Sequence, residues 1–137
     1  MKTGYTAGVF DLFHVGHINI LRNARSLCDR LVVGVTTDEL VSYKGTRPFI
    51  PFSDRIELVR ACRYVDVAVP QTDINKFAAW ERLKFDTLFV GDDWFGDDTW
   101  RTYEEKLSKV GVSVIYLPYT EGVSSTRLKR LITTAAS

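Results

Sequence analysis

The chain has two histidines, His14 and His17, and they lie three residues apart in the stretch GVFDLFHVGH. An apolar segment that predicts a strand precedes them, and a helical pattern follows directly. A helix N-terminus favours an anion, because it offers free N–H groups and the positive end of the helix dipole. Two imidazoles there can donate to phosphate oxygens, and Gly16 between them allows close approach of the backbone. The pattern favours phosphate chemistry. Incidental loop histidines are one alternative, and a metal site is another, although no third ligand lies near in sequence.

A second candidate for phosphate binding lies near the end of the chain, in TEGVSST. Ser124, Ser125 and Thr126 offer hydroxyl groups and the N–H groups of a first helical turn. Simple N-capping by Ser124 or Ser125 is the alternative interpretation. Capping and phosphate binding are compatible, so we expect both.

Strands and helices alternate along the sequence and must position these motifs. Ser53 and Asp98 are N-cap candidates, Pro70 is expected to end a strand, and Gly111 is expected to end a helix. Apolar, β-branched runs predict strands at residues 3–10, 30–37, 65–70, 86–91 and 112–118. Apolar residues at helical spacing predict helices at residues 16–28, 53–65, 73–84, 99–111 and 124–135.

The alternation predicts an α/β fold, with a three-layer, doubly wound, five-stranded parallel sheet in a single domain of residues 1–137. Right-handed crossovers place helices on both faces of such a sheet. Ligands bind outside the carboxyl ends of the strands, where the strand order reverses. GVFDLFHVGH, GDDW and TEGVSST each follow a predicted strand. We therefore expect the three motifs at the same edge of the sheet.

The composition excludes several classes of function. The net charge of +1 predicts no general attraction to nucleic acid or to an anionic membrane. No apolar run approaches the roughly 20 residues that span a bilayer, and MKTGYTAGVF lacks the apolar core of a secretory signal. Cys28 and Cys62 fit no metal-ligand spacing and are interpreted as buried reduced thiols. A cytoplasmic location is expected.

GVFDLFHVGH resembles the signature of the HxGH nucleotidyltransferase superfamily. Its members join a nucleoside triphosphate to a phosphorylated or carboxylated acceptor and release pyrophosphate. GDDW and TEGVSST narrow the resemblance to the small cytidylyltransferases and are most similar to the glycerol-3-phosphate cytidylyltransferases, with support from TTDE and RYVD. The resemblance runs from about Tyr5 to Leu131. It implies a Rossmann-like nucleotidyltransferase fold and transfer of CMP from CTP to a small phosphorylated alcohol.

The resemblance also implies a mechanism. A phosphate oxygen of the acceptor attacks the α-phosphorus of CTP, and no general base is needed because the acceptor is already an anion at pH 7. Mg²⁺ is the expected cofactor, bound mostly by phosphates and water. Asp11 could assist it, but a turn-stabilising role is the favoured interpretation of Asp11. The implied catalytic residues are His14, His17, Lys44 and Arg63.

Basic residues in two further segments gain a role from the resemblance. YKGTRPF contains Lys44 and Arg47 and is, by itself, a solvated basic loop. The resemblance makes it a lid over the triphosphate, in which Arg47 could replace a second family lysine that is Thr46 here. Arg55 and Arg63 are eight residues apart on one stripe of a predicted helix, where surface ion pairs are the alternative. The resemblance implies a phosphate contact for Arg63 and a place near the acceptor for Arg55.

Two residues of GDDW are candidates for recognising the substrates. The Asp93 carboxylate can accept a hydrogen bond from the exocyclic amine of cytosine, where uracil has an acceptor. Trp94 can wall the base or the acceptor pocket, or belong to the core, and an acidic metal-binding loop is a further alternative. The implied nucleotide-binding residues are Gly8, Val9, Phe10, Gly16, Asp93, Thr120, Gly122, Val123, Ser124, Ser125 and Thr126.

Tyr119 is the main departure from the family pattern, which has RTEG where this chain has YTEG. An arginine binds phosphate through two parallel hydrogen bonds, whereas a tyrosine donates one neutral bond. The expected acceptor-binding residues, Arg55, Trp94 and Tyr119, therefore leave the acceptor open between a phosphorylated alcohol and another phosphate or phosphonate. An adenylyltransferase of the FAD-synthetase type and a non-catalytic nucleotide sensor are the alternative functions. A homodimer is expected from the small members of the family.

Overall fold

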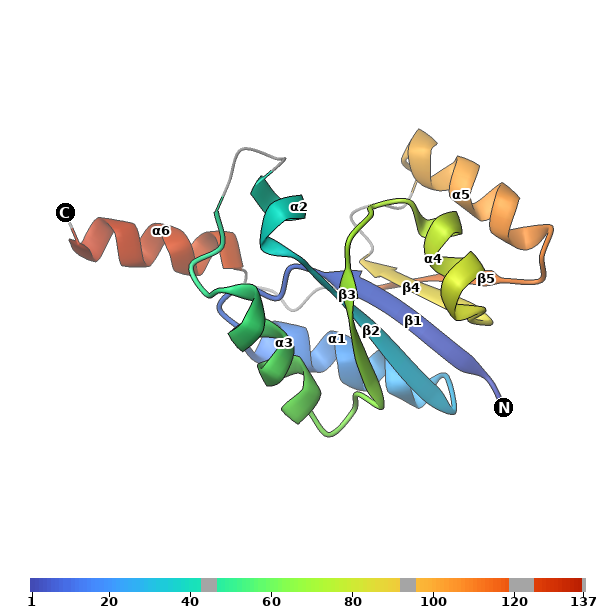
Figure 1. The fold of residues 1–137 in the computed structure, drawn as a ribbon, viewed down its shortest axis with the longest axis horizontal. Coiled ribbons are helices and arrows are strands. Elements are labelled where there is room, and N and C mark those ends of the chain that lie inside the picture. The colour runs from blue at the N-terminus through green and yellow to red at the C-terminus, as the bar shows by residue number, and fades with distance from the viewer. Residues whose placement is uncertain (43–46, 92–95, 119–124, 137) are drawn as a thin grey trace.

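The computed structural model of the chain describes residues 1–42, 47–91, 96–118 and 125–136. A parallel sheet forms its centre (Figure 1). The strands are β1 (Thr3–Gly8), β2 (Arg30–Thr36), β3 (Val67–Gln71), β4 (Thr87–Gly91) and β5 (Ser113–Leu117). The helices of the described residues are α1 (Val15–Ser26), α2 (Asp38–Ser42), α3 (Phe52–Ala61), α4 (Lys76–Leu83), α5 (Asp98–Ser108) and α6 (Ser125–Ala136).

The sheet is doubly wound. Its strands lie in the order β3-β2-β1-β4-β5, and every neighbouring pair is parallel. From β1 the chain builds outward through β2 to β3 and then crosses back to β4 and β5, so the strand order reverses between β1 and β4. The predicted five-stranded parallel sheet is confirmed.

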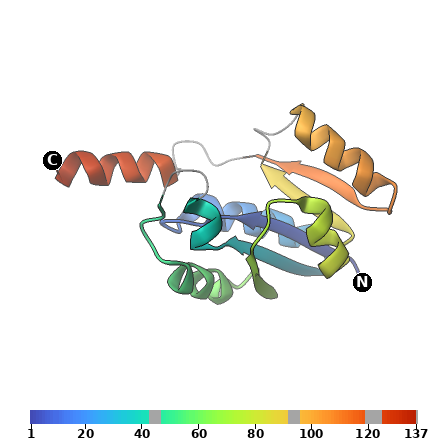
Figure 2. The same cartoon turned by 45° about the horizontal axis from the view of Figure 1, so that its top comes forward.

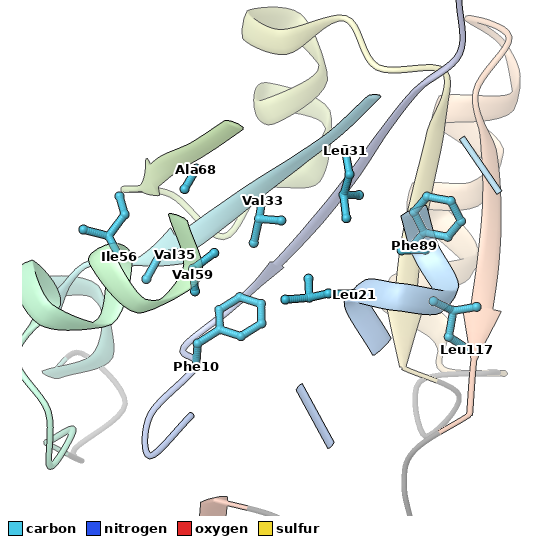
Figure 3. Close-up of a cluster of buried hydrophobic side chains, with 11 residues drawn as sticks. Phe10, Leu21, Leu31, Val33, Val35, Ile56, Val59, Ala68, Phe89 and Leu117 are labelled. Atoms are coloured by element: carbon cyan, nitrogen blue, oxygen red, sulfur yellow. The ribbon is translucent and has the colours of Figure 1, made fainter. Parts of the chain in front are cut away.

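Two apolar clusters pack on opposite faces of the sheet. One contains Leu21 of α1 and Val59 of α3, packed on Val33 of β2 (Figure 3). The other contains Leu107 of α5 and the neighbouring β2 residue Val32, together with residues of α4. Successive strand residues point to opposite faces, so α1 and α3 cover one face and α4 and α5 cover the other (Figures 1 and 2). The three-layer prediction is also confirmed.

β1 and β4 stay together for only part of their length. They pair at Gly4 with Thr87 and at Tyr5 with Leu88. β1 and β2, in contrast, pair from Thr3 to the last residue of β1. The carboxyl ends of β1 and β4 are therefore not paired with each other, at the point where the strand order reverses.

Two element boundaries differ from the sequence prediction around prolines. β3 continues through Pro70, which is opposite Val35, because β3 is an edge strand and tolerates a residue without an N–H. α3 begins at Phe52, and Pro51 occupies its N-cap position without a side-chain hydrogen bond. Ser53 is therefore inside the helix, and the prediction that it is the N-cap is wrong.

The ends of α5 also differ. Oδ1 of Asp97 accepts the N–H groups of Thr99 and Trp100 at 2.9 and 3.3 Å, so Asp97 is the N-cap instead of Asp98. Gly111, with φ of 83°, lies in the turn after α5 and not at its last residue. The short α2 was not predicted, because five residues are too few to show helical periodicity.

The cysteines are less buried than the sequence analysis expected. Cys28 and Cys62 are half-buried and form no disulfide. The Cys28 thiol donates to the carbonyl oxygen of Ala24 at 3.4 Å. Within the described ranges, no helix combines the length and apolar character needed to cross a membrane.

Candidate active site

A cavity of about 520 Å³ opens at the carboxyl edge of the sheet, between the unpaired ends of β1 and β4. Residues 6–10 and 88–91 line it from the strand ends, and His17 and Ile20 line it from α1. Small-molecule sites typically measure roughly 300–1,000 Å³. Doubly wound sheets bind ligands at this switch point. The cavity is therefore the candidate place for chemistry.

His14 and His17 hold each other at the start of α1. Nδ1 of His14 accepts the N–H of Gly16 at 3.0 Å, and Nδ1 of His17 accepts the N–H of His14 at 3.1 Å. The two rings stack with their centroids 3.9 Å apart. Because both Nδ1 atoms accept, each neutral imidazole carries its proton on Nε2. Nε2 of His14 is buried and has no hydrogen-bond partner among the described residues, which marks it as a donor available to a ligand.

Both imidazoles are neutral near pH 7. Burial lowers the pKa of His14 below its usual value. Burial, and then the neighbouring His14, lower the pKa of His17 to about 4, against a smaller opposite effect of Asp11. The pair therefore offers two neutral N–H donors at the positive end of α1, and not two cations.

The turn that presents the histidines has a strained backbone. Phe10 and Leu12 have φ of 55° and 51°, in the left-handed region. A residue other than glycine costs on the order of 1–2 kcal/mol in this region. Such strain persists only where surrounding contacts hold the backbone. Two buried charged residues, Arg55 and Asp11, provide those contacts.

Arg55 is buried beside this turn. Its Nη1 donates to the carbonyl oxygens of Val9 and Thr36, both at 2.7 Å, and its Nε donates to that of Ile50 at 2.9 Å. Its Nη2 pairs with Asp38 at 2.6 Å. With an exposed fraction of 0%, the guanidinium has no surface to offer an acceptor. The prediction that Arg55 binds the acceptor therefore finds no support in this geometry, in which its donors hold the turn.

Asp11 holds the turn with its carboxylate, which is 1% exposed. It accepts the N–H of Leu12 at 3.1 Å and those of Phe49 and Ile50 at 2.7 and 2.9 Å. Nζ of Lys129 lies 2.7 Å from Oδ2. Burial raises the pKa of Asp11, but Lys129 and the amides of Phe49 and Ile50 outweigh it and hold the pKa below its usual value. Both oxygens are engaged, which agrees with a turn-stabilising role and leaves no free oxygen for Mg²⁺.

Comparison with known proteins identifies the family of the chain. Residues 5–131 match the family described as cytidylyltransferase-like. The chain belongs to this family. This cytidylyltransferase-like chain is accordingly a nucleotidyltransferase.

Relatives of the cytidylyltransferase-like chain include glycerol-3-phosphate cytidylyltransferases and FAD synthases. Glycerol-3-phosphate cytidylyltransferases of Staphylococcus aureus and Bacillus subtilis are each 35% identical, over 95% and 96% of this chain and 94% and 98% of their own lengths. An FAD synthase of Pyrococcus abyssi is 44% identical over 116 residues, 82% of this chain and 77% of its own. Among solved structures, the lipopolysaccharide core biosynthesis protein of Thermoplasma volcanium GSS1 has a TM-score of 0.73 at 28% identity, over 88% of this chain and 97% of that one.

Several predicted site residues lie at the cavity of the cytidylyltransferase-like fold. Gly8, Val9 and Phe10, predicted to bind the nucleotide, line it together with His17, predicted to be catalytic. Gly16 is buried in the first turn of α1, where its N–H completes the histidine cap. The contact of each with CTP stays a prediction.

Arg63 lies away from the cavity within one chain. Arg55, near the start of α3, contacts the carboxyl ends of β1 and β2, and the helix runs back from there to Ala61. Arg63 follows the helix and precedes β3, which places it at the amino edge of the sheet. It is exposed there, with its guanidinium carbon 5.6 Å from the centroid of the Tyr64 ring. The prediction that Arg63 is catalytic therefore finds no support in the geometry of a single chain.

The remaining predicted residues lie in or next to segments that the structure does not describe. Arg47 is exposed, next in sequence to one of these segments. Ser125 and Thr126 begin α6. Lys44, Asp93, Trp94, Tyr119, Thr120, Gly122, Val123 and Ser124 lie outside the described residues, and their roles stay predictions.

The opposite wall of the cavity comes from residues that the sequence analysis did not single out. Gln71 is buried at the end of β3, where its Oε1 accepts the Thr36 hydroxyl at 3.0 Å and its Nε2 donates to the Asp73 carbonyl at 3.2 Å. The signal that could have found this wall is position, because Gln71 ends β3 and TDIN follows it at the carboxyl edge. Residues of this wall include Gln71, Ile74, Lys76, Trp100 and Tyr103.

Proposed function

We propose that the chain transfers CMP from CTP to a small phosphorylated alcohol of the glycerol-3-phosphate type, giving a CDP-alcohol and pyrophosphate. The observation that carries the proposal is the pair of neutral imidazoles at the start of α1. Nε2 of His14, which has no partner among the described residues, lies beside His17 of the switch-point cavity. The choice of CTP and of this acceptor rests on the similarity to the two glycerol-3-phosphate cytidylyltransferases.

The proposed reaction needs positioning and hydrogen bonds more than acid–base chemistry. An oxygen of the acceptor phosphate forms a bond to the α-phosphorus of CTP. The bond from the α-phosphorus to its bridging oxygen breaks, and pyrophosphate leaves with the electron pair. Because the acceptor is an anion at pH 7, no side chain has to remove a proton. The Nε2–H groups of His14 and His17 donate to the phosphoryl oxygens, where charge changes most in the transition state.

Residues outside the described ranges complete the proposed site. Lys44 and the start of α6 would hold the β- and γ-phosphates, as the family resemblance implies. Asp93 would accept from the cytosine amine. Trp94 and Tyr119 would contact the acceptor, and another phosphate or a phosphonate remains the alternative acceptor.

Mg²⁺ is proposed to arrive with the nucleotide. Among the residues that the structure describes, no group of three His, Cys, Asp or Glu side chains could hold a metal ion. Asp11 is engaged by backbone amides and Lys129. These residues do not fit a protein-bound Mg²⁺, so phosphate oxygens and water are its expected ligands. Activity should need Mg²⁺, whereas calorimetry should detect no Mg²⁺ binding to the chain without CTP.

Adenylyl transfer of the FAD-synthase type is the second candidate function. The similarity to the Pyrococcus abyssi FAD synthase, at 44% identity over 82% of the chain, favours it. The two candidates share the histidine pair and the cavity, because both reactions attack an α-phosphorus. They differ in the base and in the acceptor.

An acceptor panel distinguishes these functions. The chain is incubated with each of the four nucleoside triphosphates and with glycerol-3-phosphate, other phosphorylated alcohols, a phosphonate or FMN. Pyrophosphate release and the mass of the product are measured. We expect CTP and a phosphorylated alcohol to give a CDP-alcohol. Turnover of ATP with FMN alone would replace the proposal by FAD synthesis, and CTP binding without pyrophosphate release from any pair would indicate a nucleotide sensor.

A homodimer is part of the proposal, on the basis of the family resemblance. Sedimentation equilibrium of the full chain measures it directly. A single species at the mass of 15.6 kDa would contradict it.

A further inference from the structure

One carboxylate connects three segments that the proposed function assigns to phosphate binding. Asp11 belongs to the turn that presents the two histidines. It accepts the N–H groups of Phe49 and Ile50, which follow the predicted triphosphate lid. Lys129 of α6 pairs with the same carboxylate at 2.7 Å. The position of α6 is thereby coupled to the position of the histidine turn.

Within the part of the chain that the structure describes, α6 packs little against the strands and the other helices. Figures 1 and 2 show the helix extending away from the sheet, with its C-terminal end far from the other elements. Leu131 and Ile132 in its second half are 59% and 46% exposed. Lys129 is 28% exposed, and its Nζ lies 5.4 Å from the centroid of the Phe49 ring. Lys129 therefore anchors the half of α6 that lies nearer the site.

We propose that Lys129 is a positioning residue, which through Asp11 sets the place of the first turn of α6 and so controls binding of the triphosphate. Lys129 is four residues after the first residue of α6, one turn along the same face of the helix. Fixing Lys129 therefore fixes the first turn. The inference rests on the proposed function, in which this turn binds the β- and γ-phosphates, and it assigns Lys129 no contact with the nucleotide.

The ion pair between Lys129 and Asp11 explains why loss of Lys129, and not of another cation on α6, should weaken binding of the triphosphate. Breaking a buried ion pair is costly when one charge stays behind without a partner. The 1% exposed Asp11 carboxylate would be that charge. Without Lys129, the first turn of α6 would have to be ordered each time CTP binds, and that ordering opposes binding. The histidines would stay in place, because Asp11 keeps its bonds to Phe49 and Ile50.

The test compares Lys129→Met with Lys129→Arg and with Arg130→Met. Arg130 is the exposed neighbour on the same helix, so its variant is matched in charge loss. We expect Lys129→Met to raise the KM for CTP about tenfold, in the range of coupling between contacting residues, with kcat within about threefold of the parent. Lys129→Arg should have a KM for CTP close to that of the parent. Arg130→Met should leave both KM and kcat unchanged. Hydrogen exchange at residues 125–136 should be faster in Lys129→Met.

Several outcomes would overturn the proposal. Faster exchange in α6 with an unchanged KM would make the pair structural only. A fall in kcat with KM unchanged would show that Lys129 stabilises the transition state and not the bound triphosphate. If Lys129→Met does not fold, Lys129→Gln, which keeps a donor for Asp11, should show a smaller rise in KM, and no rise would contradict the inference.

Binding of inorganic triphosphate separates this inference from the proposed function, because it needs neither a base nor an acceptor. Weaker binding to Lys129→Met than to the parent supports the positioning role, even if no nucleotide and acceptor pair releases pyrophosphate. Equal binding to both refutes the positioning role, even if cytidylyl transfer is found.

Discussion

Nδ1 of His17 accepts the backbone N–H of His14 at 3.1 Å, while Nδ1 of His14 accepts the N–H of Gly16 at 3.0 Å. The two side chains thus form a reciprocal capping box, the arrangement that Ser or Thr and Glu form at other helices. The same two bonds place the protons on Nε2. One arrangement therefore begins α1 and prepares two donors for phosphate oxygens.

Replacing His14 by Asn should separate these two roles. Asn is among the best N-cap residues, so His14→Asn should keep the free energy of unfolding within about 0.5 kcal/mol of the parent. It removes the Nε2 donor, and loss of one preorganised donor lowers turnover on the order of a hundredfold. Pyrophosphate release and urea unfolding measure the two effects.

Two variants serve as controls for His14→Asn. His14→Ala should lose both the activity and about 1 kcal/mol of stability, because Ala cannot cap. Val15→Ala changes an exposed neighbour and should leave the rate of turnover unaltered. Normal turnover in His14→Asn would remove His14 from the proposed mechanism.

The protonation of the histidines can be observed directly, because the chain contains two of them. In an ¹⁵N NMR titration, Nε2 should carry the proton in both rings at pH 7. His17 should titrate near the pKa of about 4 that burial and His14 give it. A His17 that titrates at its ordinary value of 6.5, or that carries its proton on Nδ1, would contradict the geometry of the pair.

The same shift predicts how stability depends on pH. The unfolded chain protonates His17 near 6.5, whereas the folded chain does so near 4. Between these values the unfolded chain binds more protons, so the free energy of unfolding falls as the pH falls through this window. The parent should therefore lose stability relative to His17→Asn between pH 6.5 and 4. Urea unfolding at pH 7 and pH 5 tests the sign, and a constant difference would show that the pKa of His17 is not lowered by folding.

Sequence patterns were sufficient to predict the fold and to place the histidine pair at the start of a helix. β2 is buried along most of its length, and such continuous apolar strands separated by helical patterns specify a parallel sheet with two covered faces. The spacing of His14 and His17 after the first strand is local information, so it needed no tertiary contact to be interpreted.

Arg55 and Arg63 show where the same reasoning failed. Eight residues on one helical stripe still separate two side chains by roughly 12 Å along the axis. Within a single chain the two arginines could therefore not serve the same edge of the sheet, and α3 in fact ends before Arg63. The burial of Arg55 depends on Val9, Thr36 and Ile50, three segments whose convergence no local pattern records.

Tyr119 offers a test of acceptor selection. The resemblance places an arginine at this position in the glycerol-3-phosphate cytidylyltransferases, so Tyr119→Arg restores a bidentate phosphate donor. We expect the variant to lower the KM for glycerol-3-phosphate about tenfold, with little change in the KM for CTP. The acceptor panel measures both constants, and Tyr119→Phe, which lacks the hydroxyl, is the matched control. An unchanged ranking of acceptors in Tyr119→Arg would show that selection lies elsewhere, for example at the cavity wall that includes Gln71.

Replacing Arg55 by Met tests its assignment as a positioning residue. The change removes the donor to the half-buried carbonyl oxygen of Val9 and to the buried one of Thr36. An unsatisfied buried acceptor costs roughly 1–3 kcal/mol, so Arg55→Met should lose about 3 kcal/mol or more of stability. Release of the strained turn should also lower kcat, because the histidines lose their fixed position.

Arg60→Met is the matched control, because Arg60 is on the same helix and its ion pair with Glu57 is 51% and 71% exposed. Exposed pairs contribute little, so this variant should stay within about 0.5 kcal/mol of the parent in urea unfolding. The prediction also specifies which kinetic constant must respond. If Arg55 contacted the acceptor directly, its replacement would raise the KM for the acceptor and leave stability unchanged. That result in Arg55→Met would restore the ligand role that the buried geometry argues against.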